Sequence, residues 1–164
     1  MEWKIEGICN IKILLKPYDF KENETINVVC TSLFKMRKGY KYFEKYMNGL
    51  QLAIPFFTTK IHGMKFLLFI DDSIAKDPIL WDRINKMNNE KLIIMHFTCP
   101  AYLEYKLVGT GRGHTELFGT LIRFLPFFKY DGNFTKNVIC IDADIDATDA
   151  NQLLLNYNIF QKIN

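Results

Sequence analysis

Short apolar segments with β character alternate along this chain with longer segments whose apolar residues recur at helical spacing. Such alternation builds βαβ units and a mostly parallel sheet covered on both faces. The predicted strands cover residues 26–30, 65–70, 91–97 and 137–141. The predicted helices run from about 40 to 53, from Asp77-Pro78 to about 87, from about 115 to 124, and after Thr148 to about 160. The first is expected to stop before Pro55, and the second is expected to be capped by Asp77. The sequence therefore predicts an α/β fold.

Residues 1–25 do not follow this alternation. Their apolar residues indicate one or two strands, and a polar connector follows. We expect an N-terminal strand or hairpin extension on the sheet edge, followed by one domain over residues 26–164. A chain of 164 residues with 49% apolar content is large enough to bury the core of such a domain.

Composition excludes several classes of function. The net charge is only +3, and the one dense basic run, residues 35–38, is too short to indicate nucleic-acid binding. No apolar stretch approaches the roughly 20 residues that span a bilayer, and the N-terminus lacks a signal-peptide pattern. The four cysteines, Cys9, Cys30, Cys99 and Cys140, form no CxxC pair and are predicted to be reduced core thiols. These features predict a cytoplasmic protein in a reducing compartment.

Polar residues follow three of the predicted strands directly. Thr31 and Ser32 follow the first strand, Asp71-Asp72 the second, and Asp142-Ala143-Asp144 the fourth. In open α/β sheets, ligands bind beyond the carboxyl ends of the strands. Two carboxylates at positions i and i+2 of a strand end can converge on one hard divalent cation that also bridges two phosphates. The glycine-containing segment 109–113 is expected to form a loop ahead of the helix near 115.

The same acids have other interpretations. An EF-hand is excluded, because Ala147 stands where that loop needs glycine and Leu153 where it needs glutamate. A strand followed by DxD is also typical of haloacid-dehalogenase-like phosphatases, in which Asp142 would be the nucleophile, although that motif normally comes near the start of the domain. A non-catalytic interaction domain is a third alternative. Asp146 alone is better explained as the cap of the last helix.

Two separated segments carry a resemblance to a known family. Residues 120–128, TLIRFLPFF, precede a polar gap and then residues 138–145, VICIDADI. This arrangement resembles the central signature of glycogenin-like and bacterial glycosyl- or galactosyltransferases of the GT-A fold, in which a helix with an xxRFxxP segment precedes a strand ending in DAD. Upstream, residues 28–32 and 69–73 are similar to the first two strand ends of GT-A enzymes, which contact the nucleotide base.

The resemblance implies a Rossmann-like GT-A nucleotide-binding half that binds a nucleoside-diphosphate sugar, preferably a uridine one, with Mn²⁺ or Mg²⁺ as cofactor. It assigns Asp142 to the metal and the ribose, and Asp144 to the metal and the diphosphate. It places Arg123 on a helix facing the nucleotide, paired with Asp142 or with the donor phosphate. The residues that it places against the nucleotide from the first two strand ends are Thr31, Ser32 and Asp72, with Asp71 less favoured than Asp72.

Some parts of the family's site have no counterpart in this sequence. Family members continue well beyond the DxD strand to supply the acceptor site, a further metal ligand and any catalytic base. This chain stops at Asn164, one predicted helix after the motif. We therefore expect a donor-binding part without the acceptor-binding half, either as a fragment of a longer glycosyltransferase or as a reduced protein. His96 and His114 are possible ligands to which the sequence assigns no role.

Overall fold

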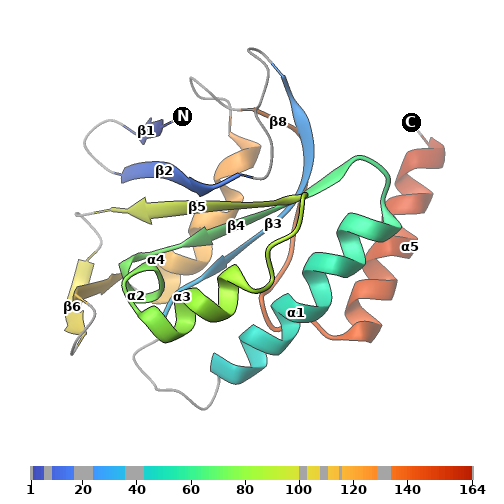
Figure 1. Ribbon diagram of the computed structural model, residues 1–164. Helices are drawn as coiled ribbons and strands as arrows, with labels where there is room; N and C mark the ends of the chain where they lie inside the picture. The colour runs from blue at the N-terminus through green and yellow to red at the C-terminus, as the bar shows by residue number, and fades with distance from the viewer. Residues whose placement is uncertain are drawn as a thin grey trace.

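The computed structural model describes residues 2–5, 9–16, 24–35, 43–99, 103–107, 111–114, 116–128 and 134–163 (Figure 1). None of the helices in these ranges combines the length and the apolar character that crossing a bilayer requires. The strands are β1 (Glu2–Ile5), β2 (Cys9–Leu15), β3 (Ile26–Leu33), β4 (Met64–Ile70), β5 (Leu92–Thr98), β6 (Leu103–Leu107), β7 (Gly111–His114) and β8 (Thr135–Cys140). The helices are α1 (Phe43–Lys60), α2 (Asp72–Ala75), α3 (Pro78–Asn85), α4 (Glu116–Leu121), the 3₁₀ segment η2 (Ile122–Phe127) and α5 (Ala147–Ile163).

A six-stranded sheet forms the centre of the fold, with the strand order β1-β2-β5-β4-β3-β8. The pairs β5–β4, β4–β3 and β3–β8 are parallel, whereas β1–β2 and β2–β5 are antiparallel. The predicted α/β class is therefore confirmed, and so is the N-terminal hairpin on the sheet edge. Among the four parallel strands the order along the chain is 3-2-1-4, as in a Rossmann-like half, and it reverses between β3 and β8.

Helices cover both faces of this sheet (Figure 1). On one face α1, α3 and α5 enclose an apolar core that includes Met47, Leu50 and Phe57 of α1. On the other face η2 packs on a second core through Ile122. Strands that are covered on both faces read as continuous apolar runs, which is why β4 and β5 were recognisable in the sequence.

Helix α1 continues through Pro55 to Lys60, so the prediction that the helix pattern stops before Pro55 is wrong. The predicted start, near residue 40, lies outside the described residues. Proline removes the hydrogen bond that its N–H would donate to the carbonyl four residues earlier, here Gln51. Both Gln51 and Pro55 are exposed, so water can satisfy that carbonyl, while Ile54 and Phe57 remain buried in the core. Burial of the apolar face thus outweighs the local cost of the proline.

The segment before β8 differs from its prediction in two places. Part of the predicted glycine loop, residues 111–113, belongs to β7, which pairs antiparallel with β6 in a separate two-stranded sheet. The predicted helix over 115–124 is instead α4 followed by η2, which includes Pro126. The ring of Pro126 clashes with the carbonyl of the residue four positions earlier and supplies no N–H to bond it, so the regular α-helix does not continue and the chain forms a 3₁₀ segment.

The cysteines divide into two pairs. Cys9 and Cys99 form a disulfide, because the antiparallel register of Asn10 with Thr98 brings Cys9 of β2 opposite Cys99, the residue that follows β5. The expectation of reduced thiols is therefore wrong for this pair, and the cytoplasmic location stays a prediction. Cys30 and Cys140 are free, and they face each other across β3 and β8 with 3.2 Å between their sulfur atoms.

Candidate functional site

The carboxyl ends of β3 and β8 lie side by side where the strand order reverses. The amide of Ile141 donates to the carbonyl of Cys30 at 3.0 Å, which continues the pairing one residue beyond β8. From β3 the chain leaves toward α1 on one face, and it reaches β8 after η2 on the other face, so a crevice opens between them. A pocket of about 110 Å³ occupies this position. Its lining residues are Ser32, Leu33, Phe34, Tyr46, Thr120, Arg123, Asp142, Ala143 and Asp144.

Two acids, Asp142 and Asp144, project from a well-anchored turn after β8, residues 141–145, which we call the acid turn. Ile141, Ala143 and Ile145 are buried and fix the turn, whereas the side chain of Asp142 is 68% exposed and that of Asp144 is 29% exposed. The turn also lies directly against Gly49 of α1, since a Cβ at that position would lie 2.1 Å from the carbonyl oxygen of Ala143. Alternating burial thus turns both carboxylates toward solvent from one rigid support.

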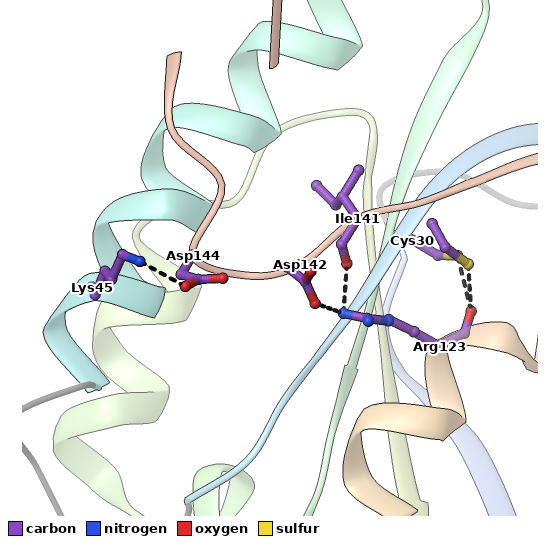
Figure 2. Close-up of polar contacts among 7 residues, drawn as sticks. Cys30, Lys45, Arg123, Ile141, Asp142 and Asp144 are labelled. Atoms are coloured by element: carbon purple, nitrogen blue, oxygen red, sulfur yellow. Dashed lines mark hydrogen bonds and ion pairs between the residues drawn. The ribbon is translucent and has the colours of Figure 1, made fainter. Parts of the chain in front are cut away.

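Arg123 of η2 reaches the first acid from the second face of the sheet. Its Nη1 donates to the carbonyl of Ile141 at 3.1 Å and forms an ion pair with Asp142 (Figure 2). The Arg123 side chain is only 14% exposed, and its Nε is fully buried with no hydrogen-bond partner in the described part of the chain. A buried guanidinium donor without a hydrogen-bond partner is costly.

The backbone of Arg123 is held by the free thiols. Cys30 Sγ and Cys140 Sγ each lie 3.1 Å from its carbonyl oxygen and 3.2 Å from each other, so one thiol can donate to the carbonyl while the other donates to the neighbouring sulfur. The hydrogen bond with Cys140, together with burial, raises the pKa of Cys30 well above its usual value, so this thiol stays protonated and keeps its donor. The cysteines therefore anchor the backbone of Arg123.

Lys45 of α1 reaches the second acid from the opposite side. Its Nζ lies 2.9 Å from Asp144 Oδ2, and the Lys45 side chain is 66% exposed (Figure 2). The hydrogen bond with Asp144 raises the pKa of Lys45. Sequence reasoning did not find Lys45, because nothing in the pattern aligns the first turn of α1 with the acid turn 99 residues later. Tyr46, which the helical pattern would assign to the core, also lines the pocket.

The predicted residues of β3 lie on different sides of the sheet. Ser32 lines the pocket, whereas Thr31 does not, and both are inside β3 instead of closing it as expected. Neighbouring residues of a strand face opposite sides, so Thr31 shares the side of Val29 and Leu33, in the core beneath α1. Thr31 is fully buried, and its Oγ1 has no hydrogen-bond partner among the described residues.

Asp71 and Asp72 follow β4 and do not line this pocket. Asp71 is fully buried and caps α2 by accepting from Ser73 N at 2.9 Å. Asp72 contacts His96 Nε2 and Lys76 Nζ, both at 2.7 Å. Burial acts to raise the pKa of Asp72, but these two hydrogen bonds outweigh it and hold the pKa below its usual value. Asp72 is thus part of a local polar cluster at a neighbouring strand end.

Two further expectations concern single residues. Asp146 caps α5 as predicted, accepting from Thr148 N at 2.8 Å and from Asp149 N at 2.9 Å. His114 lies in β7, but its side chain is outside the described residues. His96 is explained by its contact with Asp72.

The two carboxylates of the acid turn suit a cation that is also bound by the phosphate groups of a ligand. Among the described side chains, no group of three or more His, Cys, Asp and Glu could enclose a metal ion. Mg²⁺ is usually held by one or two carboxylates together with substrate phosphates and water, and carboxylates also suit Mn²⁺. In the structure each acid instead binds a basic side chain, so both carboxylates are placed to bind positive charge.

At the switch point of an open α/β sheet, the pocket is lined by two carboxylates and a buried guanidinium, and the exposed ammonium group of Lys45 binds one of these carboxylates from a neighbouring cavity. Such a set can bind a divalent cation together with a phosphate-bearing ligand. Comparison of this chain with known protein families, with curated proteins and with solved structures found no match.

Proposed function

We propose that this chain binds a nucleoside-diphosphate sugar, preferably a uridine one, through a divalent cation held by Asp142 and Asp144, as the donor-binding part of a glycosyltransferase. The observation that carries the proposal is the position of the two acids. They follow β8 at the point where the strand order reverses, and Arg123 stands beside them with an unmet buried donor. The resemblance of residues 120–128 and 138–145 to GT-A enzymes supplies the substrate class.

Each part of the pocket has a task in binding such a donor. Asp142 and Asp144 would hold Mn²⁺ or Mg²⁺, which when bound acts as a Lewis acid on the diphosphate. The planar guanidinium of Arg123 can donate two parallel hydrogen bonds to a phosphate. Ser32 offers a hydroxyl on the same wall. Small-molecule sites usually measure about 300–1,000 Å³. The pocket measures about 110 Å³, so it suits the diphosphate, with base and sugar extending beyond it.

Thermal unfolding and calorimetry with UDP and Mn²⁺ test the proposal. Ligand at 100 times its dissociation constant stabilises the folded state by about 2.7 kcal/mol, so a clear rise in melting temperature is expected only when UDP and Mn²⁺ are both present. Asp142→Asn and Asp144→Asn should each abolish that rise. Asp82→Asn is the matched control, because Asp82 is an exposed acid paired with Lys86 on α3.

Two results would contradict the proposal. One is the absence of UDP binding by the wild-type protein in the presence of Mn²⁺. The other is unchanged affinity in both Asp142→Asn and Asp144→Asn. Mg²⁺-dependent hydrolysis of p-nitrophenyl phosphate that disappears in Asp142→Asn would instead favour the phosphatase interpretation.

A further inference from the structure

The first turn of α1 is fixed against the acid turn. Gly49 contacts the backbone of Ala143, and Lys45 stands four residues earlier on the same face of the helix. The ammonium group of Lys45 therefore extends along this contact to Asp144, at 2.9 Å. The position of Lys45 beside the acid turn follows from the packing of α1 and does not depend on the ion pair itself.

The ion pair itself is easily exchanged. The Lys45 side chain is 66% exposed, and exposed ion pairs are weak because water screens the charges and a long side chain must be ordered. A divalent cation that binds Asp144 would displace the ammonium group. Lys45 would then remain beside the cation, on a flexible stem with three donors that no longer bind Asp144.

Charge balance indicates what the released group binds. In the structure, Asp142 and Asp144 are neutralised by Arg123 and Lys45. Adding a divalent cation to the two acids leaves two excess positive charges, those of the guanidinium and the ammonium groups. The diphosphate of a nucleotide sugar carries two negative charges, which match those of the guanidinium and ammonium groups, although the nearby Asp146 adds a further negative charge that also acts on Lys45.

We infer that Lys45 is a phosphate-binding residue that exchanges partners, holding Asp144 in the metal-free state and the diphosphate of the donor in the loaded state. This inference rests on the proposed function. Arg123 serves the same diphosphate from η2 on one face of the sheet, and Lys45 reaches it from α1 on the other face. The N-terminal end of α1 carries a partial positive charge that favours an anion at the same place.

Titration calorimetry on Lys45→Met tests the exchange with two probes. For Mn²⁺ alone, the variant should bind about three-fold more tightly than wild type, because the competing ammonium group is gone. For UDP in saturating Mn²⁺, it should bind about ten-fold more weakly, because a charge-assisted hydrogen bond to phosphate is lost. A residue with a purely structural role would not shift the two affinities in opposite directions.

The controls separate the possible failures. Lys86→Met removes another exposed lysine paired with an aspartate and should change neither affinity. Lys45→Arg keeps a cation and should restore UDP binding toward wild type. If wild type binds neither Mn²⁺ nor UDP, the proposed function fails. If wild type binds both and Lys45→Met is unchanged, or shifts both affinities in the same direction, the role of Lys45 is wrong while the proposed function stands.

Discussion

Gly49 of α1 lies so close to Ala143 that a methyl group on its Cα would come within 2.1 Å of the Ala143 carbonyl oxygen. The contact is between backbone atoms, so no side chain can move aside to relieve it. The acid turn therefore takes its position from a helix that is distant in the sequence, and residue 49 must lack a Cβ for the two to meet.

Gly49→Ala should push α1 and the acid turn apart. We expect a loss of about 1–3 kcal/mol from overpacking, of which alanine's better helix propensity returns up to about 1 kcal/mol. UDP binding in Mn²⁺ should weaken as well, because both acids move with the turn. Urea unfolding and calorimetry measure the two effects. Gln51→Ala, on the exposed side of α1, is the control, and equal UDP affinity in both variants would argue against a positioning role for Gly49.

Asp77 is expected to stabilise the start of α3 in two ways. Its carboxylate accepts from Ile79 N at 3.0 Å and from Leu80 N at 3.1 Å, and it pairs with Lys35 Nζ at 2.7 Å. Asp77→Ala should cost about 1 kcal/mol through loss of the cap, whereas Asp77→Asn keeps a capping oxygen and should cost less. Urea unfolding at neutral pH measures both variants. Equal losses would show that the ion pair, and not the cap, carries the effect.

The same carboxylate gives stability a dependence on pH. The hydrogen bond from Lys35 holds the pKa of Asp77 below its usual value. The contribution of Asp77 is therefore fully present above the unfolded-state pKa of about 4 and is lost as the pH falls through the lower folded-state pKa. The stability difference between wild type and Asp77→Asn should shrink as the pH falls below 4. A difference that stays constant down to pH 2 would contradict the assignment.

The cysteine pairs predict a simple thiol count. Under denaturing conditions without reductant, Ellman's reagent should detect the two thiols of Cys30 and Cys140, and reduction should add those of Cys9 and Cys99. In the folded protein Cys30 should react slowly, because its raised pKa and its burial keep the thiolate scarce and covered. Detection of four thiols before reduction would show that the disulfide does not form.

Pro55 is expected to be a source of instability that the fold tolerates. Pro55→Ala should restore the hydrogen bond to the Gln51 carbonyl and stabilise the protein by about 1–3 kcal/mol. Thermal and urea unfolding measure the gain, and Gln51→Ala again serves as the control on the same face of the helix. Destabilisation on replacing Pro55 would mean that the proline ring itself makes packing contacts that outweigh the lost hydrogen bond.

Local sequence patterns predicted those strands and helix starts whose position does not depend on contacts with distant parts of the chain. The apolar runs of β4 and β5 and the Asp77-Pro78 start of α3 were recognisable from a few neighbouring residues. Pro55 misled the prediction of α1, because the buried positions on both sides of it are what keep the helix intact. The strand end at Thr31 was placed too early for a similar reason, since β3 is held through Leu33 by its pairing with β4.

The sequence predicted those members of the candidate site that follow strand ends or belong to a recognisable motif. Asp142 and Asp144 stand on a single strand end, and Arg123 was predicted through the resemblance of residues 120–128 to GT-A enzymes. Tyr46 lines the pocket, and Lys45 binds Asp144 beside it, because α1 packs against the acid turn, which is a long-range relationship without a local pattern. The Cys9–Cys99 bond escaped prediction for the same reason, since it depends on the register of β2 with β5.

The pairing of β3 with β8 also determines at which stage of folding the pocket forms. Cys30 and Cys140 are 110 residues apart, so their strands meet only after a long loop has closed and its entropy has been lost. Contacts of such high sequence separation slow folding. We therefore expect β3 and β4, which are joined through α1, to associate earlier. A nascent or partly unfolded chain would keep most of its sheet but lack the acid turn, so it would not bind the ligand. Ligand binding would therefore indicate that folding is complete.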